Sequence, residues 1–340
     1  MQSNTQRTAL STERQTASLG AKLDCEAGRE VITYSANFLR KDIENVVANL
    51  SDATTSQAFK SWEVGDVKKF ISTGLPTKAV VVDGLHAGAF RSTLGNSNTV
   101  SPYKLGDISP ETLAAYTESF FTAGNMTVVG SGVDHAELVD LVERNFAHVK
   151  TDDTPAVSAE YHGGFESRNS TGNGETAVAV GYEGVAAGSE DQTASLVLEA
   201  IVNAAVKGAG ECINYNYADT GLFGVYVEGN GDATSATVST GVNTLKAVVG
   251  GGFDDAAVGA AKNRVMMAVL DKSAAERADF YSGQALTTNA PLTPEAFADA
   301  VDAVTTADVK AVAKKIAASK PVVSSAGNVA YAPYASELGL

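Results

Sequence analysis

The sequence has few of the residues that build disulfide or metal scaffolds. Only two cysteines, Cys25 and Cys212, occur in 340 residues, and neither belongs to a Cys-X-X-Cys pair. A disulfide-dense scaffold is therefore excluded, and a zinc knuckle has no support. We expect both cysteines to be small buried thiols without a redox role.

Basic residues are also scarce. The chain has 25 Lys and Arg against 40 Asp and Glu, which gives a formal net charge of -15. Because a nucleic-acid binder normally presents a basic face, nucleic acid is disfavoured as a partner. The acidic residues are spread along the chain rather than gathered in a tail, so they indicate solubility rather than a calcium site.

Long apolar runs are missing as well, although 44% of the residues are hydrophobic. No stretch reaches the length that a membrane helix needs, so we expect no membrane span. The length of the chain suits two domains. Residues 1–20 are rich in Ser and Thr and carry Arg7, Arg14 and a single acid, Glu13. This composition mildly resembles a mitochondrial transit peptide, but we favour a polar connector inside the fold.

The first half of the chain alternates between strand and helix patterns. Ser109-Pro110 is a strong helix start, because a capping hydroxyl precedes a proline whose missing N–H costs nothing there. Asp134 opens another predicted helix. The further predictions are a hairpin over 22–38, helices from 42, over 55–70, 77–94 and 109–121, and a strand over 126–130.

The pattern stops between Val149 and Ala159, where the sequence is polar and broken by Pro155. We therefore predict an N-terminal domain over 1–150, a linker over 151–165 and a C-terminal domain over 166–340. The second half is predicted to contain strands over 175–182, 212–217, 222–228 and 322–326, and helices over 189–205, 233–249, 254–270, 274–286, from 293, and over 308–318.

The two halves end alike. In each, a helix opened by a capping residue precedes a short apolar strand that ends at glycine, Gly130 in the first half and Gly327 in the second. This similarity indicates an internal duplication of an α+β domain.

Several segments, in the same order along the chain, resemble the motifs of one family. The sharpest match is Asp219–Tyr226, Asp-Thr-Gly-Leu-Phe-Gly-Val-Tyr, which is similar to the Asp-Thr/Ser-Gly-Leu-Phe-Gly-Ile-Tyr hairpin of the pitrilysin-like proteins, the family that includes the mitochondrial processing peptidases. Weaker matches are Glu30–Leu39, Arg91–Asn96, Tyr161–Gly164, Ala260–Arg264 and Ala326–Asn328. The resemblance implies two homologous domains, each a mostly antiparallel sheet packed with helices.

Within the family, Phe59–Val64, Leu85–Ala87 and Ser131–His135 look most like the second core-subunit branch of respiratory complex III, ubiquinol–cytochrome c reductase. That resemblance implies a heterodimer with a core 1 type subunit, within a dimeric complex that holds the other complex III subunits. It implies a peripheral position on the matrix side of the mitochondrial inner membrane. The family's opening strands and first long helix have no counterpart here, so we expect the chain to be truncated at its start.

Active members of the family bind zinc through His-X-X-Glu-His on a helix, where the glutamate takes a proton from the bound water. None of the four histidines, His86, His135, His148 and His162, lies in this motif. His162 and Glu166 have helical spacing, but the two glycines between them argue against a helix. We therefore predict an inactive relative with no catalytic residue, no cofactor-binding residue and no metal ligand. The chain also shows no ligand pattern for haem or an iron–sulfur cluster.

Three rival functions follow from the same resemblance, and the weakest is a bacterial-type peptidase partner with no respiratory role. Lys207–Gly210 stands where the alpha subunit of the processing peptidase has a longer glycine-rich, substrate-handling loop. The first rival is such a substrate-binding, non-catalytic alpha-type subunit, although the short loop argues against it. The second is an active peptidase whose zinc helix lies outside this sequence. Trp62 and Phe59 are expected to be core residues rather than a ligand platform.

Overall fold

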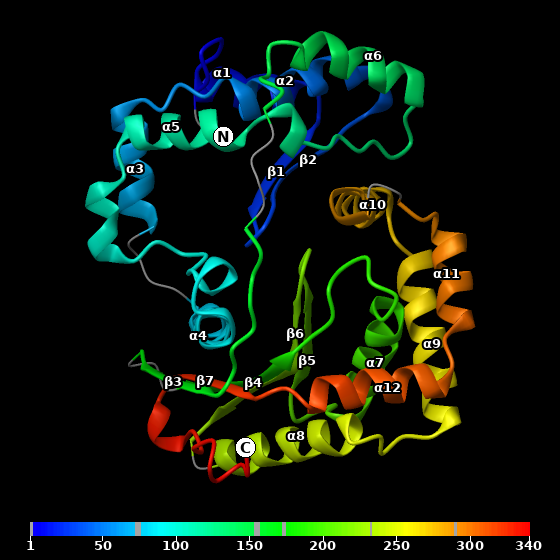
Figure 1. The fold of residues 1–340 in the computed structure, drawn as a ribbon. Helices are drawn as coiled ribbons and strands as arrows, with labels where there is room; N and C mark the ends of the chain where they lie inside the picture. Colours follow the sequence, from blue (N-terminus) through cyan, green and yellow to red (C-terminus); the bar gives the residue numbers. More distant parts are fainter. Residues whose placement is uncertain (1–2, 72–75, 153–156, 172–174, 232, 289–290) are drawn as a thin grey trace. The chain divides into compact units, whose positions relative to one another are not determined.

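The computed structural model describes residues 3–71, 76–152, 157–171, 175–231, 233–288 and 291–340. The chain forms two compact units (Figure 1). Unit 1 comprises Met1–Gly74, Asn98–Ala156 and Ser273–Leu286, and unit 2 comprises Leu75–Ser97, Val157–Lys272 and Thr287–Leu340. Segments from both halves of the sequence therefore contribute to each unit.

Unit 1 is mostly helical. Its one described sheet is a hairpin of β1 (Lys22–Ala27) and β2 (Ile32–Asn37), which pair antiparallel with Cys25 opposite Tyr34. Its longer helices are α1 (Ala9–Ser18), α2 (Ile43–Thr55), α3 (Ser61–Ile71), α5 (Pro110–Phe120), α6 (His135–Phe146) and most of α10 (Ala274–Thr288).

The small core of unit 1 lies where α2 packs on α6. Ile43 and Val47 of α2 are buried against Leu141 of α6. The start of α6 is fixed locally, because the Asp134 carboxylate accepts hydrogen bonds from the N–H groups of Ala136 and Glu137 at 3.0 and 3.1 Å. Unit 1 thus depends on helix packing and caps more than on its sheet.

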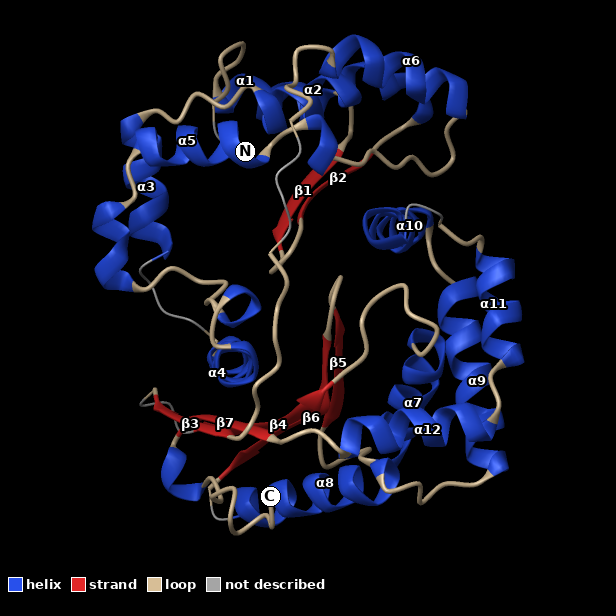
Figure 2. Ribbon diagram, in the orientation of Figure 1, coloured by secondary structure: helices blue, strands red, loops and turns tan. Residues whose placement is uncertain are grey.

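Unit 2 is built on a five-stranded sheet (Figure 2). The strands are β3 (Phe165–Ser170), β4 (Glu175–Glu183), β5 (Glu211–Asn216), β6 (Gly221–Asn230) and β7 (Val322–Gly327), in the order β3-β7-β4-β6-β5. Only β3 and β7 are parallel, and the other neighbours are antiparallel. The central strand β4 is buried along seven consecutive residues, as expected for a strand covered on both faces.

Helices cover this sheet on both sides. Helix α4 (Thr77–Phe90) packs on β3, β4 and β7, while α8 (Ala233–Val249) lies on the other side (Figure 1). Helices α7 (Gln192–Ala205) and α12 (Thr306–Ala317) pack with α8, and α9 (Asp255–Leu270) and α11 (Pro294–Ala303) pack on α7. Close approach of α4 requires Gly88, because a Cβ there would lie 2.7 Å from Val322 Cγ1.

Most predicted elements are confirmed. The 22–38 hairpin, the helix from residue 42, the strand over 175–182 and the 212–228 hairpin are present, as are the three helices between 233 and 288. The α+β fold class is also confirmed. None of the described helices is long and apolar enough to cross a membrane.

Several predictions were wrong. Residues 126–130 do not form a strand, since a strand needs a neighbour and the strands described in unit 1, β1 and β2, pair with each other. The predicted polar connector contains helix α1, which is capped by Thr8. Strand β3 was not predicted. Trp62 is 66% exposed rather than in the core, and Cys25 is exposed rather than buried.

The predicted linker over 151–165 is described only in part, because residues 153–156 lie outside the described residues. The residues of this segment from 157 onward belong to unit 2 and are hydrogen-bonded to it. The Ala159 N–H donates to the Asp219 carboxylate at 2.5 Å, and the Tyr161 hydroxyl donates to the Lys320 carbonyl at 2.6 Å. The division into domains 1–150 and 166–340 stays a prediction.

Candidate functional site

The histidine that the structure places deepest is His86, on α4, which is fully buried. Its Nδ1 lies 2.7 Å from the Val82 carbonyl oxygen, which can only accept, so Nδ1 carries the hydrogen. Its Nε2 then accepts a hydrogen bond from the Tyr217 hydroxyl at 2.6 Å. Phe90, Tyr215 and Tyr217 surround the ring. These contacts make His86 a packed and hydrogen-bonded core residue.

The other three histidines lie in separate places. His135 is the exposed first residue of α6, and His148 Nε2 lies 2.9 Å from Thr55 Oγ1. His162 and Glu166 do not share a helix, since Gly163 and Gly164 have φ of +60° and +69° and Glu166 lies on β3. Over the described residues, no group of three or more His, Cys, Asp or Glu side chains is placed to hold a metal ion.

The Asp-Thr-Gly-Leu-Phe-Gly motif spans the turn after β5 and the first residues of β6. The Tyr217 N–H donates to the Thr220 carbonyl at 2.8 Å and closes the turn. Gly221 is required because a Cβ there would lie 2.5 Å from the Val185 carbonyl oxygen, and at Gly224 it would lie 2.0 Å from the Val180 carbonyl oxygen. The motif therefore has a packing role: its glycines let neighbouring backbone approach closely.

The glycines of Lys207–Gly210 form a tight turn between α7 and β5. The Ala209 N–H donates to the Val206 carbonyl at 2.8 Å, and Gly208 has a φ of +88°. A Cβ at Gly210 would lie 2.5 Å from the Tyr226 carbonyl oxygen. The segment is thus packed against β6, and its glycines are explained by the turn.

A polar stripe on α7 faces the edge strand β5. Ser195, Glu199 and Asn203 are spaced four residues apart, so they share one face of the helix. Asn203 Oδ1 accepts from the Cys212 N–H at 2.8 Å, and the Asn214 side-chain amide donates to Glu199 at 3.0 Å. These bonds cover polar groups that an edge strand would otherwise leave free.

This stripe also sets the chemistry of two titratable groups. Burial raises the pKa of the Glu199 carboxyl, and the hydrogen bond from Asn214 offsets part of that effect. Burial and the nearby Glu199 raise the pKa of the Cys212 thiol well above its usual range. A thiol held in its protonated form is a poor nucleophile. Cys212 is buried and Cys25 is exposed, and both are free.

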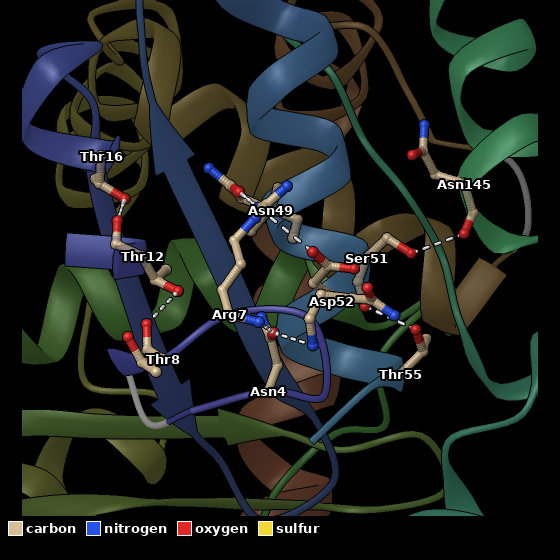
Figure 3. A network of polar contacts seen from close by, with 12 residues as sticks. Asn4, Arg7, Thr8, Thr12, Thr16, Asn49, Ser51, Asp52, Thr55 and Asn145 are labelled. Carbon is tan, nitrogen blue, oxygen red and sulfur yellow. Dashed lines mark hydrogen bonds and ion pairs between the residues drawn. The ribbon is translucent and has the colours of Figure 1, made fainter. Parts of the chain in front are cut away.

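A second polar network joins the segment just before α1 to α2 in unit 1 (Figure 3). The Arg7 guanidinium contacts Asn49, which is 2% exposed, and lies 3.3 Å from the Asp52 carboxylate. The Arg7 N–H donates to Asn4 Oδ1 at 2.5 Å. One arginine thus satisfies a buried amide and pairs with a partly buried acid, which holds the residues that lead into α1 on α2.

Unit 1 also exposes large apolar side chains. Trp62 and Phe70 on α3 are 66% and 80% exposed, and Tyr116 and Phe120 on α5 lie with their rings 4.9 Å apart, both about half exposed. Helix α3 has no buried residue among those described. Exposed apolar groups of this size are typical of surfaces that bind another protein. These exposed groups were not predicted from the sequence, because Trp62 was expected to be a core residue.

Two family models match separate stretches of the chain. Residues 1–102 match the model described as insulinase, peptidase family M16. Residues 107–265 match the model described as the peptidase M16 inactive domain.

Individual relatives cover almost the whole chain. It is 29% identical to rat cytochrome b-c1 complex subunit 2, mitochondrial, over 94% of this chain and 77% of the relative. The human protein of the same name is 27% identical over the same shares. The alpha-2 subunit of the mitochondrial-processing peptidase from Dictyostelium discoideum is 27% identical over 98% of this chain and 81% of the relative.

Proposed function

We propose, from the premise that the chain belongs to peptidase family M16, that it is a non-catalytic core subunit of mitochondrial respiratory complex III. Its role is to support the structure and assembly of ubiquinol–cytochrome c reductase. It does so as one half of a heterodimer with a core 1 type subunit, peripheral to the inner membrane on the matrix side. The other subunits of the complex carry out electron transfer.

The observation that carries this proposal is that rat, mouse, human and Neurospora crassa relatives, each similar over almost the whole chain, carry one name, cytochrome b-c1 complex subunit 2. The mouse cytochrome b-c1 complex subunit 2 is 28% identical over 94% of this chain, and the Neurospora crassa subunit 2 is 27% identical over 98%. The similarity thus extends over almost the whole chain, and it covers 77–80% of these relatives. The match of residues 107–265 to an inactive domain supports a role without catalysis.

The exposed apolar side chains of unit 1 also support a role in assembly. Trp62, Phe70, Tyr116 and Phe120 would be costly to leave in water on an isolated protein. Aromatic residues are enriched in protein–protein interfaces, where their large side chains contribute much of the binding energy. A subunit of a large complex has the partners that could cover them.

The second candidate is an alpha-type, substrate-binding and non-catalytic subunit of the mitochondrial processing peptidase. The Dictyostelium discoideum relative favours it, because that protein carries this name and matches 98% of the chain. The compact Lys207–Gly210 turn argues against it, since the short segment is packed on β6 and offers little length for handling a substrate. We therefore place it second.

Native electrophoresis separates the two candidates. Mitochondrial membranes from cells that make this chain are solubilised in mild detergent, resolved on a native gel and analysed by mass spectrometry. The proposal predicts that the chain comigrates with cytochrome b and cytochrome c1, and that a complex IV subunit in the same gel does not follow it. A soluble heterodimer of about twice the chain's mass would support the second candidate instead.

A further inference from the structure

We infer that a cavity in unit 1 binds a small organic cation, a primary ammonium or guanidinium group on an apolar stem. The cavity has a volume of about 260 Å³. Three segments line it: the end of α2 with the residues that follow it, one face of α5, and residues 148–150. The volume is below the range of pockets that hold drug-sized ligands, so it suits a small molecule or a single side chain.

The hydroxyl groups in the cavity have already used their hydrogens. Thr54 Oγ1 donates to the Leu50 carbonyl at 2.9 Å, and Thr117 Oγ1 donates to the Ala114 carbonyl at 3.0 Å. Each hydroxyl has one hydrogen and two lone pairs. Toward any further partner, both oxygens can therefore act only as hydrogen-bond acceptors.

The same reasoning assigns the tautomer of His148. Thr55 Oγ1 donates its single hydrogen to the Ser51 carbonyl at 2.7 Å, so it accepts from His148 Nε2 at 2.9 Å. Nε2 of the neutral ring then carries the hydrogen, and Nδ1 is an acceptor. Gln57 Nε2 donates to the Thr54 carbonyl at 2.7 Å, which leaves the Gln57 oxygen as a further acceptor.

The cavity also contains an ion pair, and its carboxylate can accept hydrogen bonds from a cationic ligand. Lys150 Nζ lies 2.6 Å from Glu118 Oε1, so its charge is matched within the site. A carboxylate accepts about four hydrogen bonds, and Glu118 can therefore accept from a second cation beside Lys150. The net charge of -15 favours cations over anions at longer range.

The apolar part of the wall includes two aromatic side chains, Phe59 and Phe121, beside Ala114 and Val149. Aromatic faces attract ammonium and guanidinium groups as well as apolar stems. Phe59 has a φ of +42°, in the left-handed region that residues other than glycine rarely adopt. Strained residues of this kind cluster at binding sites, where the surrounding structure holds them.

The ligand chemistry has two sources, a free amine or the Lys or Arg side chain of another protein. The test is calorimetric titration of the full chain with phenethylammonium chloride as the free amine, and with the capped amino acids N-acetyl-lysine methylamide and N-acetyl-arginine methylamide. The neutral analogue 2-phenylethanol has nearly the same shape and should bind at least tenfold more weakly. Binding of the free amine indicates the first source, and binding of only the capped amino acids indicates the second.

Two variants of the same ion pair give opposite predictions. Glu118→Gln removes the negative charge and should weaken binding at least fivefold. Lys150→Met removes the internal cation that competes for Glu118 and should tighten binding several-fold. Both variants break the pair, so damage to the fold would weaken binding in both. Glu143→Gln on α6 removes one exposed charge outside the cavity and should change the affinity less than twofold. The inference is overturned if none of the three cationic probes shows saturable binding, or if Lys150→Met weakens it.

Discussion

Replacing Gly224 by alanine tests whether the Asp-Thr-Gly-Leu-Phe-Gly motif is a packing requirement. Gly224 lies opposite Gly181 in the β4–β6 pair, and a Cβ there would be 2.0 Å from the Val180 carbonyl oxygen. Because ordinary contacts begin near 3.4 Å, the strands would have to separate locally by about 1.4 Å. N–H···O bonds tolerate a range of only about 0.5 Å, so the neighbouring ladder bonds would break.

The cost follows from the buried groups left without partners. Each such group costs about 1–3 kcal/mol, and overpacking adds strain, so Gly224→Ala should lower the free energy of unfolding by about 3–5 kcal/mol. Gly259→Ala is the matched control: Gly259 is exposed on α9, and its Cβ would meet nothing within 4 Å. That variant should gain up to about 1 kcal/mol from helix propensity.

Denaturant titration followed by hydrogen-exchange mass spectrometry measures both variants. Peptides from β4 and β6 report the local opening of unit 2 directly, which is needed because the chain has two units that can unfold separately. Gly224→Ala should expose these peptides at lower denaturant, and Gly259→Ala should not. A Gly224→Ala protein as stable as the wild type would refute the packing argument.

Three further variants test the polar groups. Burial raises the pKa of the Glu199 carboxyl in the folded state, so the stability that this group contributes is present at low pH and is lost as pH rises through that pKa. Glu199→Gln, which can still accept a hydrogen bond from Asn214, should therefore stabilise unit 2 at pH 7 by about 1.4 kcal/mol for each tenfold difference between the acid dissociation constants of the folded and unfolded states. In thermal melts, this gain in stability should be lost by pH 4. A constant advantage at both pH values would contradict the assignment. Tyr217→Phe removes the donor to buried His86 and should cost about 1–3 kcal/mol in denaturant titrations; an unchanged midpoint would rule out that cost. Arg7→Met removes the cation that contacts two α2 side chains and should speed hydrogen exchange in α1, whereas wild-type protection of α1 would show that the network does not hold it.

Local chemistry explains which elements could be predicted from the sequence. Ser109 and Thr293 accept hydrogen bonds from Thr112 and Ala296, each at 3.2 Å, and both stand directly before a proline at the first helical position. The capping side chain and the backbone N–H that it accepts from lie within four residues of sequence, so the sequence alone contains the whole interaction.

Elements that depend on distant partners were harder to predict. Strand β3 is polar at every position after Phe165, and it exists because it pairs with β7, 157 residues further along the chain. Residues 126–130 have a strand-like sequence but no paired neighbour in the described structure. The prediction that Trp62 is a core residue was wrong because burial also depends on distant neighbours. The apolar character of a side chain does not show whether another part of the chain covers it.

The candidate sites, too, could be predicted from the sequence only where their residues form one continuous segment. The sequence analysis predicted no catalytic, cofactor or metal residue, and this stays a prediction. The cation cavity could not be found in the sequence, because Thr55, Glu118 and His148 come from three segments that only packing brings together. By contrast, the family motif at Asp219–Tyr226 is one continuous segment and could be identified directly.

Depletion of this chain in the cells that make it tests the central claim most directly. The two readouts are ubiquinol–cytochrome c reductase activity with the amount of assembled complex III, and cleavage of a mitochondrial presequence substrate by the same extract. A non-catalytic core subunit predicts loss of assembled complex and of reductase activity, with presequence cleavage unchanged. Normal complex III together with impaired presequence cleavage would contradict the account and assign the chain to the processing peptidase.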